Sequence, residues 1–342
     1  MSESRFYHFT AKGLFYGIDT LDKAVAATAE EGFVWFNFYQ PAKETLYSLV
    51  DKIGIHPLSV EDCFDDEQVP KIEHFLNNTF IIFNSFSYIK NELFIDEINI
   101  FIGKNFLITV SGHNSDGRKP LNNCEGIIET GNTNAKLGPD FLMHIVLDWL
   151  VDEKYKSFDG MEEELEEAEE SLLADVEKFQ PMQLIRMRKS LMRLRKTLYH
   201  EREILVKICR LDCPYVTEKA IVHYRDIYDH LAKFFELTET YREIETSLME
   251  LNTSLLNNLM TKMSNDTNTS VRRLTLIATI FMPLTLLASI GGMSEWSMMT
   301  GPQNWKITYP LFLMGMIILG IGSYILIKRT EKRTEKRKNE KL

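Results

Sequence analysis

Cysteine is scarce in this sequence of 342 residues, which has only four, and their spacing excludes the roles that paired cysteines usually take. Cys209 and Cys213 have the spacing of half a zinc site, but no second pair and no nearby pair of histidines completes it. We therefore expect ordinary packed thiols. The sequence also offers no paired nucleophile and base and no phosphate-binding loop, so an enzyme is not expected.

Charged residues are missing from two long stretches near the C-terminus. Residues 274–293 are 20 positions without a charge, and residues 307–327 form a second uncharged run after a short polar loop. About 20 apolar residues in a helix cross the ~30 Å hydrocarbon core of a bilayer. A buried hairpin is the alternative, but soluble cores rarely need two uncharged segments of this length. The sequence therefore predicts two transmembrane helices, and residues 1–10 lack the features of a signal peptide.

Glycine and proline are absent from residues 215–282. If these 68 residues are helical throughout, they form a rod of about 100 Å that runs directly into the first span. Large side chains recur in alternating steps of three and four, which is typical of a coiled-coil seam; they are Phe234, Leu237, Tyr241, Ile244, Leu248, Leu251 and Leu255. Pro283 lies inside the span, where hydroxyls such as that of Thr279 are expected to satisfy the freed carbonyl.

Acidic residues outnumber Lys and Arg by 49 to 39, but the charge is unevenly placed. Residues 328–342 are strongly basic, so the acidic excess lies in the region before the spans. Such a charge argues against nucleic acid as a partner and suits divalent cations. Basic pairs flank the spans at both outer ends, at residues 272–273 and 328–329. The positive-inside rule then places both termini in the cytoplasm and residues 294–306 outside.

The region before the spans has two parts. Residues 33–38, 80–83 and 106–110 are short, aromatic and β-branched, and they predict strands of a mixed α/β domain. His56 and His74 are expected to have turn and surface roles rather than to bind metal. Residues 112–138 resemble a loop between domains. The chain then becomes helical, with an acidic run at 161–170 and a basic run at 185–198 that is expected to lie against it.

The first span has one face that is mostly small or polar. Steps of three and four from the preceding helix connect these positions, and they therefore share one side of a helix; they are Asn268, Val271, Thr275, Ala278, Met282, Thr285, Ser289 and Gly292. Membrane helices pack closely through small residues and hydroxyls, so this face fits a helix–helix contact. It equally fits the wall of a water-filled pore made by several copies of the helix. Periodicity alone leaves both interpretations open.

The motif of the first span resembles the pore helix of the CorA magnesium/cobalt transporter family. The similarity rests on residues 279–285, Thr-Ile-Phe-Met-Pro-Leu-Thr, followed by Gly292 and Met293. The family signature at this point is Gly-Met-Asn, and here Ser294 takes the place of the asparagine. Gly291 stands where an aromatic residue is usual. Residues 56–62 and 70–73 also resemble the cytosolic domain of that family.

The resemblance implies a fold and a division of the chain. The fold is an α+β cytosolic domain, with a mixed sheet and helices, followed by long α-helices and two transmembrane helices in a homopentameric funnel. The expected parts are an α/β domain at 1–137, a long-helix and coiled-coil region at 138–272, a pore-lining span at 273–293, an external loop at 294–306, a second span at 307–327 and a basic tail at 328–342.

The resemblance also assigns roles to residues. Gly292, Met293 and Ser294 form the outer mouth, with Glu295 as a neighbouring ring of carboxylates. Asn268, Thr285 and Ser294 hold a hydrated ion through its water shell. The apolar narrowings of the gate are Val271, Leu274 and Met282, of which Leu274 lies one step off the polar face and rests on the resemblance alone.

The function implied is transport of a divalent cation across the cytoplasmic membrane, with Mg²⁺ first and Co²⁺ or Ni²⁺ next, under the control of intracellular metal. No cofactor is expected besides the transported cation. Ser294 leaves the ion open, because a serine ring offers one hydroxyl per subunit where asparagine offers a carbonyl and an amide. The alternatives are a transporter of Zn²⁺ or another divalent ion, with or without protons, and a non-conducting regulatory relative anchored in the membrane.

Overall fold

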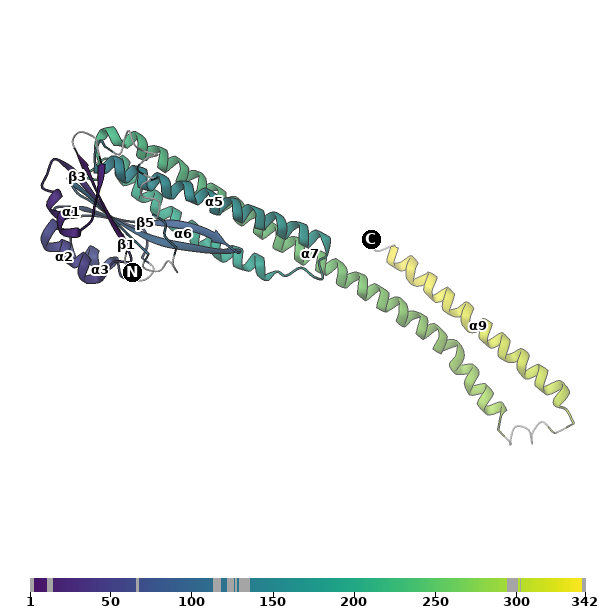
Figure 1. Ribbon diagram of the computed structural model, residues 1–342. Helices are drawn as coiled ribbons and strands as arrows, with labels where there is room; N and C mark the ends of the chain where they lie inside the picture. Colours follow the sequence, from purple (N-terminus) through teal and green to yellow (C-terminus); the bar gives the residue numbers. More distant parts are fainter. Residues whose placement is uncertain are drawn as a thin grey trace. The chain divides into compact units, whose positions relative to one another are not determined.

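The computed structural model describes residues 3–10, 15–65, 68–112, 118–121, 126, 128, 136–293, 301 and 303–339. It divides into two compact units, which we call the N-terminal unit (Met1–Thr253) and the C-terminal unit (Ser254–Leu342). Figure 1 shows a sheet with helices in the first unit and helices alone in the second. The helix α7 (Glu218–Gly291) belongs to both units.

The N-terminal unit is built on a seven-stranded sheet with the order β2-β1-β3-β7-β6-β5-β4. The pair β3–β7 is parallel and the other neighbouring strands are antiparallel, so the sheet is mixed as expected. The strands are β1 (Glu3–Thr10), β2 (Phe15–Ile18), β3 (Gly32–Tyr39), β4 (Ile72–His74), β5 (Thr79–Ile89), β6 (Glu92–Ile102) and β7 (Phe106–Ser111). The three strands expected from the sequence correspond to β3, β5 and β7.

Helices cover the two faces of this sheet (Figure 1). One face carries α1 (Leu21–Ala27), α2 (Lys43–Ile53) and α3 (Pro57–Asp62) over a core rich in phenylalanine. Phe36 and Phe38 of β3 point into this core, because alternate residues of a strand share a face. Trp35 and Asn37 point to the opposite face, where the Trp35 indole N–H donates to the hydroxyl of Thr109 (3.0 Å).

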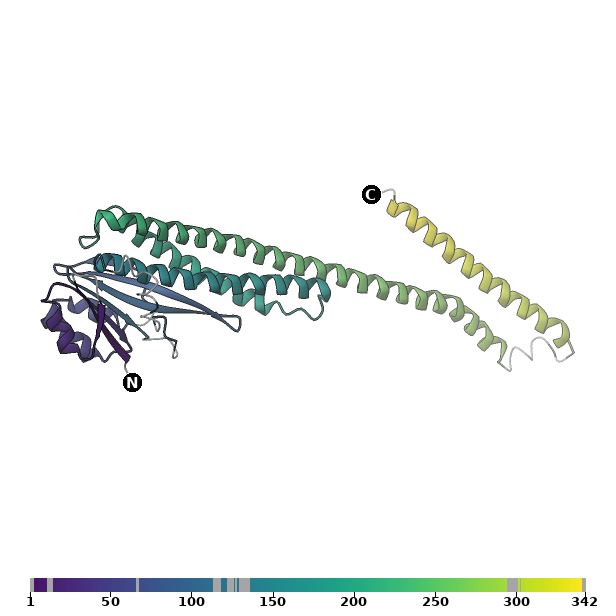
Figure 2. The same cartoon turned by 45° about the horizontal axis from the view of Figure 1, so that its top comes forward.

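Three long helices form the other layer of the N-terminal unit. They are α5 (Pro139–Ala174), α6 (Met182–Cys209) and the first half of α7, which lie side by side in Figures 1 and 2. The breaks between them lie at residues 175–181 and 210–217, and each of these segments contains a proline, Pro181 or Pro214. The acidic and basic helices are neighbours, as their charges suggested.

In the ion pair that joins α5 to α6, the acidic helix supplies the cation and the basic helix supplies the anion, which is the reverse of what the charge runs suggest. Lys154 belongs to the acidic helix and Glu201 to the basic one, and both side chains are fully buried. The second carboxylate oxygen of Glu201 accepts the backbone N–H of Asn84 on β5 (3.0 Å). The Lys154 ammonium lies 4.3 Å from the ring centres of both Phe83 and Phe86. The pair therefore joins two helices and the sheet at one buried point.

The seam predicted on α7 is half correct. Phe234, Tyr241 and Leu248 are buried, but the alternating positions are buried one residue later, at Thr238, Glu245 and Asn252. Ile244 of the predicted seam is 39% exposed. At Thr238 the hydroxyl donates to the Phe234 carbonyl (2.8 Å), and a buried polar group is tolerated when it is hydrogen-bonded in this way.

The C-terminal unit consists of the rest of α7 and α9 (Trp305–Asn339). The helix predicted from the absence of glycine and proline is unbroken, and it continues through Pro283 to Gly291. Both helices contain a segment long and apolar enough to cross a membrane. In the second helix that segment is Lys306–Arg329, which contains the predicted span at 307–327.

Candidate functional site

The polar face of α7 lines a groove in the C-terminal unit. The groove has a volume of about 550 Å³ and is formed by Leu274, Thr275, Ala278, Thr279, Met282 and Pro283. Three of the positions connected by steps of three and four in the sequence, Thr275, Ala278 and Met282, therefore line one continuous surface. Leu274, which the periodicity placed one step away, lies on the same surface. Met282 is 72% exposed, so its side chain extends from the helix without covering.

Hydroxyl groups along this face bond to the helix itself. Thr275 donates to the Val271 carbonyl (2.9 Å), and Thr285 donates to the Phe281 carbonyl (2.8 Å). Ser289 repeats the pattern with the Thr285 carbonyl (2.8 Å). A hydroxyl that donates its proton in this way keeps its lone pairs as acceptors. The face therefore presents oxygen atoms that can accept hydrogen bonds from the water shell of a cation.

The bond expected near Pro283 takes a different form. Thr279 donates to the carbonyl of Thr275 (2.7 Å), not to the carbonyl that proline leaves without its helical donor. Threonine bonds back to the residue four positions earlier because its hydroxyl lies close to that carbonyl in a helix. The position of the Thr279 hydroxyl within its own helix therefore explains why it bonds to the Thr275 carbonyl.

Two residues of α7 outside the groove lie close to α9. A Cβ atom at Gly320 would lie 3.7 Å from Leu284, and a Cβ atom at Gly291 would lie 2.8 Å from the ring of Phe312. Glycine at 291 thus allows a close approach of the second helix, which supplies an aromatic ring beside this position. These two contacts involve Leu284 and Gly291, and neither residue is among those that line the groove.

The predicted outer mouth is described only in part. The last turn of α7 continues into Gly292 and Met293, whose backbone N–H groups donate to the carbonyls of Ala288 (3.0 Å) and Ile290 (3.2 Å). Ser294 and Glu295 lie outside the described residues. Asn268 and Val271, at the other end of the face, are exposed on α7. One chain therefore provides one wall of any conduit along this face.

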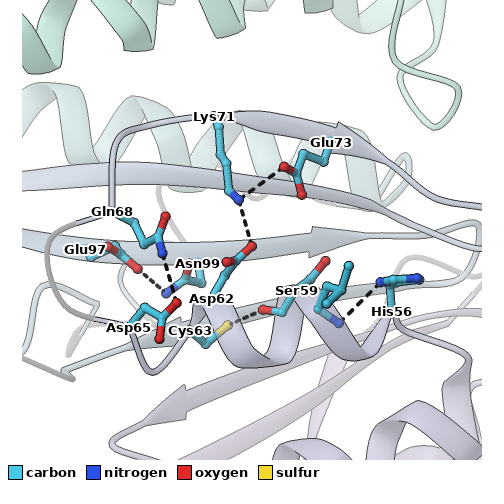
Figure 3. Close-up of polar contacts among 11 residues, drawn as sticks. His56, Ser59, Asp62, Cys63, Asp65, Gln68, Lys71, Glu73, Glu97 and Asn99 are labelled. Carbon is cyan, nitrogen blue, oxygen red and sulfur yellow. Dashed lines mark hydrogen bonds and ion pairs between the residues drawn. The ribbon is translucent and has the colours of Figure 1, made fainter.

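The N-terminal unit holds a polar cluster around Lys71, drawn in Figure 3. The Lys71 ammonium lies 2.8 Å from a carboxylate oxygen of Asp62 and 3.1 Å from one of Glu73. Both hydrogen-bonded carboxylates raise the pKa of this lysine, in opposition to the desolvation that lowers it. One lysine stands against two carboxylates in this cluster. Within the described ranges, no group of three or more His, Cys, Asp or Glu side chains is placed to hold a metal ion.

The two histidines near this cluster have structural contacts. His56 caps α3, since its Nδ1 accepts the backbone N–H of Leu58 (3.3 Å), and its ring stacks on Phe75 at 4.2 Å. His74 Nδ1 lies 3.0 Å from the hydroxyl of Thr79 on the neighbouring strand. Desolvation is the main cause that lowers the pKa of His74, so the neutral ring is favoured.

Comparison with known proteins identifies a family. The family model described as CorA-like Mg2+ transporter protein matches residues 30–329. The cobalt/magnesium transport protein CorA of Thermotoga maritima is 32% identical over 279 residues, which cover 81% of this chain and 76% of the relative. The protein of the same name from Methanocaldococcus jannaschii is 27% identical over 289 residues, covering 83% of this chain and 88% of the relative.

Solved structures share the fold over nearly the whole chain. The complete CorA magnesium transporter of Methanocaldococcus jannaschii superposes with a TM-score of 0.68 at 24% identity and covers 95% of this chain and 97% of its own. Full-length CmaX gives a TM-score of 0.66 at 16% identity, with 95% and 96% covered. At these identities the likeness is one of fold.

Proposed function

The chain belongs to the CorA-like Mg2+ transporter family, and from that premise we propose that it is a divalent cation channel or transporter with Mg²⁺ as its principal ion. The family's members are transporters, not enzymes. The single observation that carries the proposal is the face of small and polar residues on α7, of which Thr275, Ala278 and Met282 line a groove within a segment apolar enough to cross a membrane. Several copies of this helix around an axis would enclose a pore, and we propose the pentamer of the family resemblance.

The proposed pore conducts the hydrated ion. Mg²⁺ gives up its water reluctantly, so rings of amide and hydroxyl oxygens at Asn268, Thr285 and Ser294 can hold the hydration shell without removing it. Val271, Leu274 and Met282 are the proposed apolar rings, and such rings close a pore by dewetting. Intracellular metal is the proposed signal for closure. The membrane potential supplies the drive, because moving two charges through 100 mV is worth about 4.6 kcal/mol.

The proposed orientation has both termini in the cytoplasm. Arg272 and Arg273 precede the first span, and Lys328 and Arg329 follow the second. Basic residues flanking a span stay on the cytoplasmic side. Residues 294–306 are then external, and the N-terminal unit with its excess of acidic residues faces the cytoplasm.

Metal-specific flux through purified protein in liposomes tests this proposal. We expect Mg²⁺ influx that increases with an inside-negative potential, together with rescue of growth in cells that lack magnesium uptake. Co²⁺, Ni²⁺ and Zn²⁺ are measured in the same vesicles. A Zn²⁺ flux well above that of Mg²⁺ would reassign the ion, and an absence of flux for every metal would favour the non-conducting regulatory relative.

Replacing Ser294 with asparagine is expected to sharpen selectivity. The amide ring provides a longer side chain with both donor and acceptor atoms, so it should hold hydrated Mg²⁺ more firmly. We expect greater discrimination for Mg²⁺ over monovalent ions and stronger block by a hexammine cobalt mimic of the hydrated ion. Glu295→Gln is the matched variant, and it should chiefly lower flux at low ionic strength, because its carboxylate acts through a screened surface potential. Unchanged selectivity in Ser294→Asn would move the proposed filter to the Thr285 ring.

A further inference from the structure

A second cavity lies in the N-terminal unit, and the proposed transport function makes no use of it. Its volume is about 700 Å³, within the range of roughly 300–1,000 Å³ typical of small-molecule sites. Its walls come from four parts of the chain: residues 68–70, β5, β6 and α6, with Arg118 at one side. We call it the β6–α6 cavity.

One wall of the β6–α6 cavity carries unpaired cations. Arg193 and Lys196 are three residues apart on α6, so they lie on one face of that helix. Both side chains are exposed, and neither has an ion-pair or hydrogen-bond partner among the described residues. Two like charges on one face of a helix, with no ion-pair partner among the residues that the structure describes, favour an anionic ligand.

A third cation on the wall is fixed in place. The Arg118 guanidinium donates two hydrogen bonds to the carboxylate of Asp96 (2.9 and 3.0 Å), and its centre lies 4.1 Å from the ring centre of Phe94. Paired bonds of this kind fix both position and direction. The cavity therefore has a rigid side beside the pair of cations on α6.

A buried acceptor without a partner lies in the same cavity. Asn84 is 5% exposed and lines the cavity, and its side-chain oxygen accepts no hydrogen bond from any described residue. The residue is held by its backbone N–H, which donates to Glu201 (3.0 Å). A buried acceptor without a donor is destabilising, so a ligand that brings an N–H group to this atom is favoured.

A carboxyl group beside the cavity can change its charge near neutral pH. Burial raises the pKa of Glu97 to about 7, with a smaller contribution from Asp62. Hydrogen bonds from the Asn99 amide (2.9 Å) and from the Gln68 backbone, together with the charge of Lys71, act in the opposite direction. Figure 3 shows Glu97 beside Asn99 and Gln68. Glu92 is the other carboxylate on the wall, and it is exposed.

We propose that the β6–α6 cavity binds a nucleoside phosphate, with its phosphates at Arg193 and Lys196 and an amino-bearing base at Asn84. The cations alone would suit any phosphate compound. The volume and the separate buried acceptor select a ligand that also has a polar organic part with N–H donors. This inference goes beyond the proposed transport function and does not depend on it.

Calorimetric titration of the purified full-length protein with ATP tests the inference. We expect one ATP per chain, with tripolyphosphate and adenosine each binding more weakly. The double variant Arg193→Ala/Lys196→Ala should lose affinity for both phosphate compounds by roughly tenfold or more, as the loss of charge-assisted contacts predicts. Arg188→Ala/Lys189→Ala is the matched control, because these cations are exposed on the same helix and do not line the cavity.

The role of Asn84 separates a nucleotide site from a phosphate site. Asn84→Leu keeps the branched shape of the side chain and the backbone N–H, so it should weaken ATP while leaving tripolyphosphate unchanged. Affinity for ATP should fall as the pH rises through about 7, because Glu97 then gains a negative charge beside the anion. Tripolyphosphate that binds as tightly as ATP would overturn the nucleoside part. Absence of ATP binding, or equal binding by the double variant and its control, would overturn the whole inference.

Discussion

Lys154→Met is expected to lower the stability of the N-terminal unit by about 3–5 kcal/mol, because it leaves one partner of a buried ion pair without its counter-charge. Glu201 is fully buried, and desolvation is the main cause that raises its pKa while Lys154 opposes that rise. Without the lysine, the buried carboxylate must either bear an uncompensated charge or take up a proton. The midpoint of thermal unfolding of the full-length protein should fall by roughly 10 °C.

The loss should also depend on pH. In the variant, the folded-state pKa of Glu201 lies further above its unfolded value. A raised pKa of an acid means that the folded state binds more protons, so stability falls as the pH rises from the unfolded pKa towards the folded one. Unfolding midpoints measured at pH 5 and pH 8 should therefore differ more for Lys154→Met than for the unaltered protein.

Two further variants define what the ion pair contributes. Lys154→Met/Glu201→Gln removes both charges and keeps an acceptor for the Asn84 backbone N–H, so it should recover most of the loss. Lys52→Met breaks the exposed pair between Lys52 and Asp22 (2.7 Å) and should cost no more than about 1 kcal/mol. Equal losses from the buried and the exposed pair would contradict the expected role of burial.

This ion pair marks a limit of reasoning from sequence. The acidic and basic runs correctly predicted neighbouring helices, since charge complementarity acts over whole surfaces. The same reasoning from charge could not identify the pair of Lys154 and Glu201. The lysine lies on the acidic helix and the glutamate on the basic one, and the two residues are 47 positions apart. The buried contacts of single residues depend on tertiary packing, which a local charge average does not contain.

The strands show a related limit. The three strands recognised from aromatic and β-branched runs lie next to others that carry more charge, among them β6 (Glu92–Ile102). β5 and β6 form a hairpin whose turn residues, Lys90 and Asn91, have φ values of 53° and 62°. Positive φ at both central positions is the geometry of a type I′ turn, for which Asn-Gly is the strong signal. A turn that begins with lysine hides that signal in the sequence.

More of the α7 face could be predicted from the sequence, because the residues that share a helical face are close together in the chain. The spacing of small and polar residues follows from helix geometry alone, and the groove lined by Thr275, Ala278 and Met282 agrees with it. The β6–α6 cavity is the opposite case. Asn84 and Glu97 are paired across the β5–β6 hairpin, but Arg193 comes from α6, and no spacing in the sequence relates it to them.

Met282→Asp is expected to leave the proposed pore unable to close. Met282 lines the α7 groove and is 72% exposed within its own chain, so in an assembly around the polar face its side chain would form an apolar ring. A ring of carboxylates holds water in such a constriction and attracts cations, and dewetting can no longer close it. In liposomes with high internal Mg²⁺, influx should rise roughly tenfold, as expected when a barrier falls by about 1.4 kcal/mol.

The matched variants are Met282→Leu and Leu284→Asp. Met282→Leu keeps the ring apolar and should close as the unaltered protein does. Leu284 lies two residues away on the side of the helix that faces α9, where a Cβ atom at Gly320 would be 3.7 Å from it. A carboxylate there is costly in the membrane interior and should reduce the amount of assembled protein without opening the pore. If Leu284→Asp conducts more while Met282→Asp closes normally, the opposite face of α7 lines the conduit, and the roles assigned to Thr285 and Asn268 fail with it.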